Sequence, residues 1–404
     1  MSFISVEKQL EIIKRGIAEI VPEDELVKKL KKSHKNNKPL NIKLGVDPTA
    51  SDLHLGFTVV IRKLKQFQDL GHQIILIIGD YTATVGDPSG RNKTRPRLSH
   101  KEVMAFAKTY QEQFFKIVDR KKTKVVYNGD WFSKMTFSEV TELTAQMTVA
   151  QMLMREDFSN RYQNGEPISI HEFLYPLMQG WDSVKIDADV ELGATDQKFN
   201  VLVGRDLQRN SGKEPQVGLF MPLLVGTDGE QKMSKSYGNY IGISESPEEI
   251  YGKVLSIPDN LIYDYFELVT DITTEDLSDI KKRLSSGENP RDIKRELART
   301  LVRMYHSLTD SIAAEEHFDS LFIKKDIPDD IPVHSRKKGL YRVTDLITEL
   351  GLTESKGAAK RLISQGGVQI DGEKINDFNA RIELNQDMIL KVGKRKFAKI
   401  VAED

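Results

Sequence analysis

The stretch Leu44–Leu70, LGVDPTASDLHLGFTVVIRKLKQFQDL, contains the change of chain direction that decides the fold. An apolar strand predicted over Asn41–Val46 ends before Asp47, because the proline that follows cannot continue a β-ladder. A polar loop comes next, and a helix opens at His54-Leu55-Gly56-Phe57. The apolar residues beyond this point recur at helical spacing: Val60, Leu64, Phe67 and Leu70. The sequence therefore predicts a strand, a tight turn and a helix N-terminus in direct succession.

A turn of this kind can receive a phosphate group. The first N–H groups of a helix have no partner within the helix and carry partial positive charge. Gly56 lets a ligand approach the backbone closely, and His54 offers a hydrogen-bond donor to an anion at neutral pH. The alternative is a purely structural loop, since strand–loop–helix units occur throughout α/β proteins.

The composition is that of a soluble globular protein, and 404 residues predict two or three domains. No apolar run is long enough to span a bilayer, and residues 1–26 predict an amphipathic helix instead of a signal peptide. Cysteine is absent, which excludes disulfides and thiolate metal sites and is compatible with a reducing cytosol. We therefore expect a cytoplasmic protein without a membrane partner.

Charge is unevenly distributed along the chain. Residues 336–404 carry 14 Lys and Arg against 10 Asp and Glu, a balance of +4, so the remainder sums to −5. A basic C-terminal module on an acidic body indicates a polyanionic partner, although a solvated basic face gives the same count. Lys356, Lys360 and Arg361 share one face of a helix predicted over 355–365 and are candidate phosphate contacts.

A second strand, predicted over His72–Ile78, is an almost continuous apolar run, as expected for a parallel sheet with both faces buried. It leads into a polar turn, Gly79–Gly90, that contains Asp87. Four basic residues follow at once: Arg91, Lys93, Arg95 and Arg97. Glycines, a carboxylate and a basic cluster could hold an amino group beside a phosphate. The alternative is a surface loop with a solvated basic tail.

Three polar residues, Tyr175, Gln179 and Asp182, are spaced four and three apart in a predicted helix, so their side chains share one face. A phenol, an amide and a carboxylate on an otherwise apolar helix are costly to bury without partners. They are candidates for binding a polar ligand, or else they pair with one another.

A cationic loop, GTDGEQKMSKS, follows the strand predicted over 216–225. Lys232 and Lys235 stand three residues apart, with Met233 and Ser234 between them and Ser236 after them. A mobile loop with two lysines suits transient binding of a polyphosphate better than a fixed place in a core.

Two of these segments, His54–Phe57 behind Asp47 and Lys232–Ser236, together resemble the HIGH and KMSKS signatures of class I aminoacyl-tRNA synthetases. Between them, three segments resemble the tyrosyl enzymes and not the tryptophanyl ones: Gly86–Gly90, the helix with Tyr175, and Thr195-Asp196-Gln197. The C-terminal segment resembles the small alpha-L RNA-binding module of bacterial tyrosyl enzymes. The resemblance covers nearly the whole chain.

The resemblance implies a role for each matching residue. Tyr175, Gln179 and Asp87 fall where the family holds the α-amino group of tyrosine. Asp182 falls where a carboxylate accepts a hydrogen bond from the tyrosine phenol. The remaining positions near the ribose, the amino acid and the adenylate are Asp47, Asp196 and Gln197.

The same resemblance implies a nucleotide site. His54, Lys232 and Lys235 match groups that stabilise the ATP phosphates in the transition state, and we take them as the catalytic residues. This role is physically reasonable, because attack of a carboxylate on the α-phosphate depends mainly on positioning and charge stabilisation. Five more residues belong to these ATP-binding motifs: Gly56, Phe57, Met233, Ser234 and Ser236. Mg²⁺ is expected to accompany ATP, with no protein-held metal and no prosthetic group.

Four residues depart from the family pattern. Phe57 replaces the second histidine of HIGH and removes a hydrogen-bonding group from the nucleotide site, unless its ring is absorbed into packing between the helix and a neighbouring strand. Lys43 stands where many members have a tyrosine near the phenol pocket. Trp181 lies in sequence beside the specificity carboxylate, where tyrosine is usual. Ala194 replaces a common glycine.

The fold class implied is α/β, with a Rossmann-like parallel-sheet catalytic domain over 1–230. Helices follow over 231–330, as the loop with the two lysines and a helical anticodon-binding domain. After a linker at Ile327–Pro332 comes a small α+β alpha-L-type RNA-binding module over 336–404. A helical insertion near 110–160 carries scattered residues that are typical of a core or a subunit interface and is the expected homodimer contact: Met135, Phe137, Met147, Met152 and Met154.

The expected function is ATP-dependent attachment of L-tyrosine to tRNA(Tyr) through a tyrosyl-adenylate. Two alternatives are a paralogue that activates an amino acid without charging tRNA, and a non-catalytic RNA-binding homologue. The C-terminal module argues against the first, and the intact loop Lys232–Ser236 argues against the second.

Overall fold

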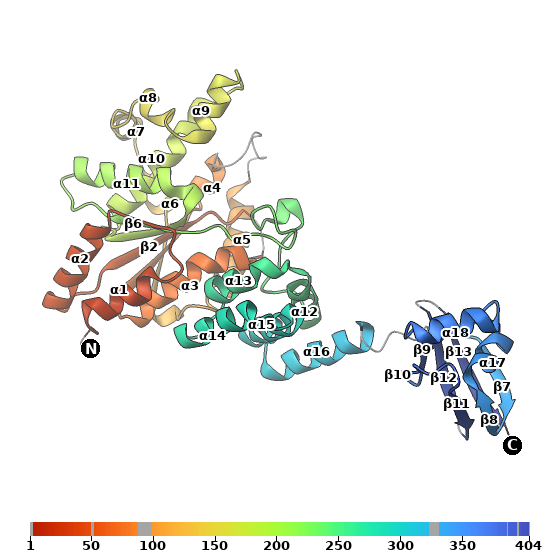
Figure 1. Cartoon of the computed structure of the whole chain (residues 1–404). Helices are drawn as coiled ribbons and strands as arrows, with labels where there is room; N and C mark the ends of the chain where they lie inside the picture. Colours follow the sequence, from red (N-terminus) through yellow and green to blue (C-terminus); the bar gives the residue numbers. More distant parts are fainter. Residues whose placement is uncertain are drawn as a thin grey trace. The chain divides into compact units, whose positions relative to one another are not determined.

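The computed structural model describes residues 3–49, 52–87, 98–322, 331–385, 387–393 and 396–403. The chain divides into two compact units, Met1–Glu315 and Glu316–Asp404 (Figure 1). The domain boundaries expected at 230, 330 and 336 stay predictions, and most of the expected linker, residues 327–330, lies outside the described part.

A six-stranded sheet forms the centre of the first unit, in the order β1-β6-β5-β2-β3-β4. Neighbouring strands are parallel except at one edge, where β1 runs antiparallel to β6. The strands are β1 Glu19–Val21, β2 Asn41–Val46, β3 Gln73–Ile78, β4 Thr123–Tyr127, β5 Val190–Ala194 and β6 Val217–Met221. This confirms the predicted parallel sheet of an α/β fold.

The expectation that residues 1–26 form an amphipathic helix is wrong at β1. Its three residues pair with the edge of β6, with Glu19 opposite Phe220. Three residues are too few to show an alternation of apolar and polar side chains. The segment is extended because it pairs with the edge of β6. The flanking segments are helical, as α1 Val6–Lys14 and α2 Glu23–Asn36.

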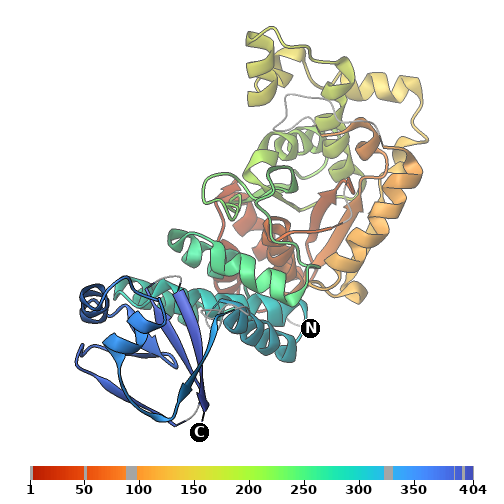
Figure 2. The same ribbon diagram turned by 90° about the vertical axis from the view of Figure 1, so that its right-hand side faces the viewer.

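Helices cover both faces of the sheet (Figures 1 and 2). In Figure 1, α10 and α11 lie on one side of the sheet, and α1 and α3 lie on the other. Besides α1 and α2, the helices of this part of the chain are α3 Leu55–Asp69, α4 Thr82–Val85, α5 His100–Phe114, α6 Gly129–Phe132, α10 Leu174–Lys185 and α11 Lys198–Asn210. Because both faces are covered, the central strands are mostly buried, and all five residues of β6 are buried.

Helix α3 follows from the spacing of its apolar residues. Leu64 and Phe67 are fully buried against the sheet, which contributes roughly 1.5–3 kcal/mol for each such side chain. At its N-terminus the His54 side chain accepts a hydrogen bond from the Gly56 N–H. The turn predicted before this helix is therefore present.

The expected insertion forms α7 Phe137–Thr144, α8 Val149–Met152 and α9 Glu156–Gln163. Part of it packs on α10 and α11 in a small apolar cluster of Leu143, Met152, Leu177, Val184, Val203 and Leu207. Met152 is buried there, whereas Phe137 and Met154 are 87% and 78% exposed. The residues that looked alike in the sequence therefore divide between a core and a free surface.

Helices occupy most of the described part of residues 231–322, as expected for this segment. It comprises α12 Pro247–Ser256, α13 Ile262–Val269, α14 Thr274–Ser285, α15 Pro290–Tyr305 and α16 Leu308–Phe322. Arg62 of α3 forms an ion pair with Asp271 at the end of α13, which joins these helices to the sheet-bearing part of the first unit.

The second unit is a small α+β structure. Its five-stranded sheet has the order β10-β9-β12-β13-β7, and β8 pairs with β11 separately. The strands are β7 Val333–Lys337, β8 Gly339–Arg342, β9 Val368–Ile370, β10 Glu373–Lys374, β11 Arg381–Leu384, β12 Met388–Val392 and β13 Lys396–Glu403. Two helices, α17 Val343–Glu349 and α18 Lys356–Ser364, pack on it through buried residues such as Ile347 and Ile363.

Candidate active site

The predicted site residues gather at the carboxyl ends of the parallel strands. Asp47 follows β2, Thr82 follows β3, Asn128 follows β4 and Asp196 follows β5. Open parallel sheets bind ligands at this edge, because the loops that leave the strands converge there. The turn after β2 and helix α10 also lie at this edge, where Tyr175 of α10 contacts Asp47.

Asp47 connects two elements of the site. Its Oδ2 accepts a hydrogen bond of 3.0 Å from the Tyr175 hydroxyl, and its Oδ1 accepts one of 2.7 Å from Thr82. The backbone of Gly79 lies so close that a Cβ there would be 2.0 Å from Asp47 Oδ1. Burial raises the pKa of Tyr175 well above 10, and the charges of Asp47 and Asp87 raise it further. The neutral phenol therefore donates to Asp47, and its oxygen can still accept.

Asp182 is buried, and both of its oxygens receive hydrogen bonds. Trp131 Nε1 donates to Oδ1 over 3.0 Å, and Asn128 Nδ2 donates to Oδ2 over 3.2 Å. Asn128 also donates to Thr82, so one polar chain runs from Tyr175 through Asp47, Thr82 and Asn128 to Asp182. Burial raises the pKa of Asp182 to about 7, against the opposing effect of Lys43 and the two donors.

The three polar residues of α10 do not pair with one another. Tyr175 donates to Asp47, Asp182 accepts from Asn128 and Trp131, and Gln179 Nε2 donates to Glu191 over 3.2 Å. Each side chain therefore joins α10 to a different part of the fold, and the alternative in which they satisfy each other is wrong.

Asp87 and Gln197 also meet. Gln197 Nε2 donates to Asp87 Oδ2 over 3.0 Å, which brings the turn after β5 to the turn after β3. The rest of that second turn, from Pro88 to Arg97, lies outside the described residues, and so do the four basic residues expected there.

His54 is a buried, neutral imidazole. Only 7% of the residue is exposed, and its Nδ1 accepts a hydrogen bond of 3.2 Å from the Gly56 N–H. The ring proton therefore sits on Nε2, which can donate to a ligand. Burial, together with a smaller effect of the nearby charge of Lys235, lowers the pKa of His54 to about 4.

Phe57 is 49% exposed, so its ring is not absorbed into packing between α3 and the sheet. It lies against His54 instead. The physical difference from the family's histidine at this position is therefore that Phe57 has no hydrogen-bond donor.

The loop with the two lysines is held beside the first turn. The Leu55 N–H donates to the Ile241 carbonyl over 2.9 Å, and the Ile243 N–H donates to the Leu53 carbonyl over 3.0 Å. Met233 is buried, and a Cβ on Gly56 would lie 3.5 Å from its Cβ. The two motifs recognised in the sequence are thus neighbours in space.

Both lysines of the loop contact carboxylates of the site. Lys232 Nζ lies 2.8 Å from Asp196 Oδ2, and Lys235 Nζ lies 3.6 Å from Asp52 Oδ2. The Ser236 N–H donates to Ser234 Oγ, and the Ser234 N–H donates to Asn239, which also binds the Lys232 carbonyl. These contacts keep the two ammonium groups at the edge where His54 lies.

Sequence reasoning missed several residues. Thr82, Asn128 and Trp131 carry no family signature in the sequence, and only the position of Asn128 directly after a strand marks it as a candidate. Asn239 was missed as well, although it follows the lysine loop closely.

Trp181 is beside Asp182 in the sequence only, because its ring packs against the cluster of α10, α11 and the insertion. It faces that cluster because a helix turns by about 100° per residue, so adjacent residues point in different directions. The indole beside the carboxylate is that of Trp131.

In the second unit, Lys356, Lys360 and Arg361 are all exposed on α18, as expected. Lys356 forms an ion pair of 2.8 Å with Asp345, and Lys360 lies over the ring of Phe378. Their role stays a prediction.

Two family descriptions match the chain. The one described as "tRNA synthetases class I (W and Y)" matches residues 35–323, and "Tyrosine--tRNA ligase SYY-like C-terminal domain" matches residues 323–400. The tyrosine–tRNA ligase of Moorella thermoacetica is 54% identical over 396 residues, covering 98% of this chain and 96% of the relative. That of Thermotoga maritima is 51% identical over 397 residues, covering 98% and 97%.

Solved structures have the same fold. A C-terminally truncated mitochondrial tyrosyl-tRNA synthetase from Aspergillus nidulans gives a TM-score of 0.65 at 23% identity, covering 79% of this chain and 94% of that one. The tyrosyl-tRNA synthetase of Archaeoglobus fulgidus, complexed with L-tyrosine, gives 0.62 at 22% identity, covering 77% and 99%. At such identities these two structures support the architecture alone.

Proposed function

Because this chain belongs to the class I tyrosyl-tRNA synthetases and attaches tyrosine to tRNA, we propose that it does so through the polar chain between Tyr175 and Asp182. The observation that carries the proposal is the buried Asp182 carboxylate, whose two oxygens are held by Trp131 and Asn128. A carboxylate oxygen can accept more than one hydrogen bond, so each oxygen still has capacity for the phenol of tyrosine.

The α-amino group of tyrosine binds at the other end of α10. Asp47, Asp87 and the Tyr175 oxygen supply acceptors for an ammonium group, and the two carboxylates supply opposite charge. Gln179 contributes its Oε1, because its amide nitrogen already donates to Glu191. The distance along α10 from Tyr175 to Asp182 then sets the length of the amino acid that fits.

ATP binds across the first turn. In the first step, a carboxylate oxygen of tyrosine attacks the α-phosphate, the bond to pyrophosphate breaks, and tyrosyl-adenylate forms. His54 Nε2–H, Lys232 and Lys235 stabilise the charge on the phosphates, and Met233, Ser234 and Ser236 hold the loop in place. Asp196 and Gln197 position the adenylate. In the second step, a ribose hydroxyl of tRNA attacks the tyrosyl carbonyl carbon, loses its proton, and AMP leaves.

Mg²⁺ enters with ATP in this proposal. The described residues include no group of three or more His, Cys, Asp or Glu that could hold a metal ion. Mg²⁺ commonly keeps water and phosphate oxygens as its ligands, which suits a cation carried by the triphosphate. This chain's residues then contribute the two lysines and the helix N-terminus.

The insertion is the proposed contact between two copies of the chain. Its surface and the adjoining segment expose several large apolar side chains: Phe137, Val149, Met154, Tyr162 and Ile170. An insertion with several large exposed apolar side chains is a candidate for contact with another protein chain. Phe137→Asp should lower the dimer fraction in analytical ultracentrifugation without unfolding the chain.

Lys356, Lys360 and Arg361 contact tRNA phosphates in this proposal, and the protein acts in the cytoplasm. Among the described helices, none is both long and apolar enough to cross a membrane.

The function is tested by tyrosine-dependent ATP–pyrophosphate exchange followed by tRNA charging. Exchange without charging would support the amino-acid-activating paralogue, and absence of both would support the non-catalytic homologue.

A further inference from the structure

A fully buried ion pair lies beneath the helix that carries the tyrosine site. Lys43 of β2 is 0% exposed and Glu191 of β5 is 1% exposed, and their Nζ and Oε1 atoms lie 2.9 Å apart. The two residues are direct partners in the register of β2 and β5. The sequence had marked Lys43 only as a departure from the family pattern.

Glu191 is saturated with donors. Its Oε1 receives Lys43 and Gln179 Nε2, and its Oε2 receives Ser183 Oγ at 3.0 Å and Gln216 Nε2. A carboxylate offers about four acceptor positions, so all of them are used. Glu191 therefore cannot bind substrate, but it fixes the side chains around it.

Lys43 makes two further contacts, both with α10. Its ammonium donates to the Gln179 carbonyl over 2.8 Å and to Ser183 Oγ over 2.6 Å. Gln179 lies three residues before Asp182, and Ser183 lies directly after it. The ion pair thus fastens the turn of α10 that bears Asp182 to the centre of the sheet.

These contacts act on two proposed substrate ligands. The bond from Gln179 Nε2 to Glu191 leaves the amide oxygen, and not the nitrogen, available to an ammonium group. The positive charge of Lys43 lowers the pKa of Asp182, whereas burial raises it and Glu191 raises it slightly. Among the described residues, Tyr175 of the same helix also interacts electrostatically with Asp182, and Asn128 and Trp131 are neutral donors to it.

We propose that Lys43 and Glu191 are positioning residues for tyrosine selection. Together they orient the Gln179 amide and fix the turn of α10 that bears Asp182, and the ammonium group of Lys43 favours the charged carboxylate that accepts the phenol hydrogen bond. This inference rests on the proposed role of Asp182. It assigns a function to a pair that touches no substrate.

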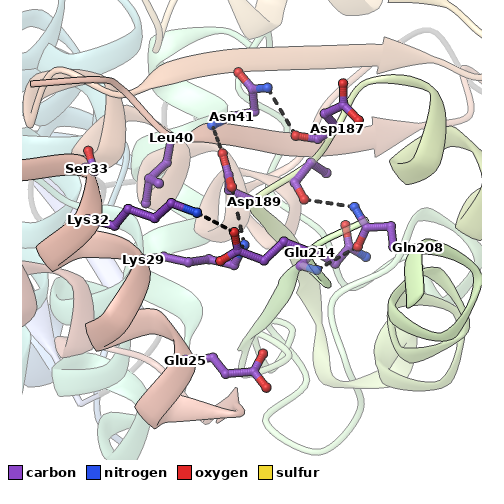
Figure 3. Close-up of polar contacts among 12 residues, drawn as sticks. Glu25, Lys29, Lys32, Ser33, Leu40, Asn41, Asp187, Asp189, Gln208 and Glu214 are labelled. Atoms are coloured by element: carbon purple, nitrogen blue, oxygen red, sulfur yellow. Dashed lines mark hydrogen bonds and ion pairs between the residues drawn. The ribbon is translucent and has the colours of Figure 1, made fainter. Parts of the chain in front are cut away.

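A second buried lysine provides a comparison. Lys29 of α2 contacts Asp189 at 3.3 Å and Glu214 at 3.4 Å, at the amino end of β2 and β5 (Figure 3). Asp189 also accepts from the Asn41 N–H at 2.9 Å. This cluster lies at the edge of the sheet away from the site residues, and its carboxylates are partly exposed, so it reports what loss of the ion pair of a buried lysine does to folding alone.

The test replaces both partners, because removing one alone leaves a buried charge unpaired. Lys43→Met with Glu191→Gln keeps the volumes, and the new amide oxygen can still accept from Ser183 or Gln216. The matched control is Lys29→Met with Asp189→Asn. For each protein, the KM for tyrosine and the ratio of kcat/KM for tyrosine over phenylalanine are measured by pyrophosphate exchange from pH 6 to 8.5, together with the Tm.

The expected result is a pH effect specific to Lys43. The KM for tyrosine at pH 6 rises about tenfold for each unit by which the Asp182 pKa increases, and the difference shrinks toward pH 8.5. Selectivity for tyrosine at pH 6 falls in parallel. The Lys29 control shifts only the Tm.

Three results would overturn the inference. One is an unchanged pH profile in the folded double variant, and a second is an equal pH shift in the Lys29 control. The third is a double variant that does not fold, which would make the pair a folding requirement. Asp182→Asn, measured alongside, separates the role of Asp182 from the role of the ion pair. Unchanged tyrosine selectivity in Asp182→Asn would refute the role of Asp182 itself. Lost selectivity there, with an unchanged pH profile in the Lys43 and Glu191 double variant, would refute this inference alone.

Discussion

The rings of His54 and Phe57 lie 4.6 Å apart, centroid to centroid, and are tilted by 45°. Phe57 therefore packs beside the imidazole that is proposed to meet the phosphates, while about half of its own surface faces solvent. An aromatic ring keeps the shape of the histidine that the family pattern has here, but it cannot donate a hydrogen bond.

Restoring that donor with Phe57→His should speed adenylate formation modestly and leave tyrosine affinity unchanged. One net hydrogen bond contributes roughly 0.5–1.5 kcal/mol, so the gain should be about tenfold at most. The exposure of Phe57 means that water can solvate the new ring, and the Tm should not fall. Single-turnover kinetics and thermal unfolding decide this, and a slower or less stable variant would exclude the missing-donor account.

Asp182→Ala should reduce activation of tyrosine and raise the relative use of phenylalanine. The carboxylate gives the phenol a buried partner, and loss of a partner for a buried polar group costs about 1–3 kcal/mol, or roughly 10- to 100-fold in relative kcat/KM. The measurement is pyrophosphate exchange with each amino acid. Equal discrimination in the variant and the parent would locate the phenol pocket elsewhere.

Lys235→Ala should lower the rate of tyrosine activation by about 100-fold, because a group that stabilises developing charge acts mainly in the transition state. Equilibrium binding of tyrosine should be unchanged. Lys253→Ala is a matched control, since Lys253 is also a partly exposed lysine in an ion pair, with Glu245. A parallel loss of tyrosine binding would reassign the loop to substrate binding or folding.

A chain that ends at residue 326 should keep pyrophosphate exchange and lose most tRNA charging. The second unit has its own buried core and carries the exposed basic residues of α18. Phosphate contacts weaken with salt, so charging by the full chain should also fall as ionic strength rises. Collapse of exchange in the shortened chain would show that the second unit belongs to the catalytic fold.

Stability should depend on pH through His72. Burial lowers the pKa of His72 from 6.5 to about 4, so the folded ring stays neutral where the unfolded ring takes up a proton. Its contribution is fully present above pH 6.5 and is lost as the pH falls toward 4. In His72→Asn, the amide oxygen can still accept from the Leu40 N–H, and the fall in unfolding free energy between these pH values should be smaller by about 1–3 kcal/mol. Denaturant titrations at several pH values measure it, and an identical slope in both proteins would contradict it.

The regular elements could be predicted because their signals are local. Asn41–Val46 and α3 were predicted from apolar spacing and a proline, and the structure has β2 and α3 there. β1 could not be predicted, because three residues carry no period and the edge of β6 determines their conformation.

The site was predictable where a residue type and its motif coincide, as for His54 and Asp182. Trp131 and Asn128 were not, since they reach Asp182 through a turn whose path depends on the sheet order. The partner of Lys43 could not be predicted either. A lysine inside a strand conveys nothing about a partner such as Glu191, which stands opposite it only after β5 has joined β2.

The pairing of β1 with β6 also affects how this protein folds during its synthesis on the ribosome. The strand leaves the ribosome early, yet its partner β6 follows about 200 residues later, which at about 5–20 residues per second means a delay of at least about 10 s. Strands β2, β3 and β4 can pair in the meantime, whereas β5 and β6 must emerge before the sheet is complete. The segment that forms β1 therefore stays unpaired on the nascent chain during this delay. Cotranslational chaperones can bind it throughout that time.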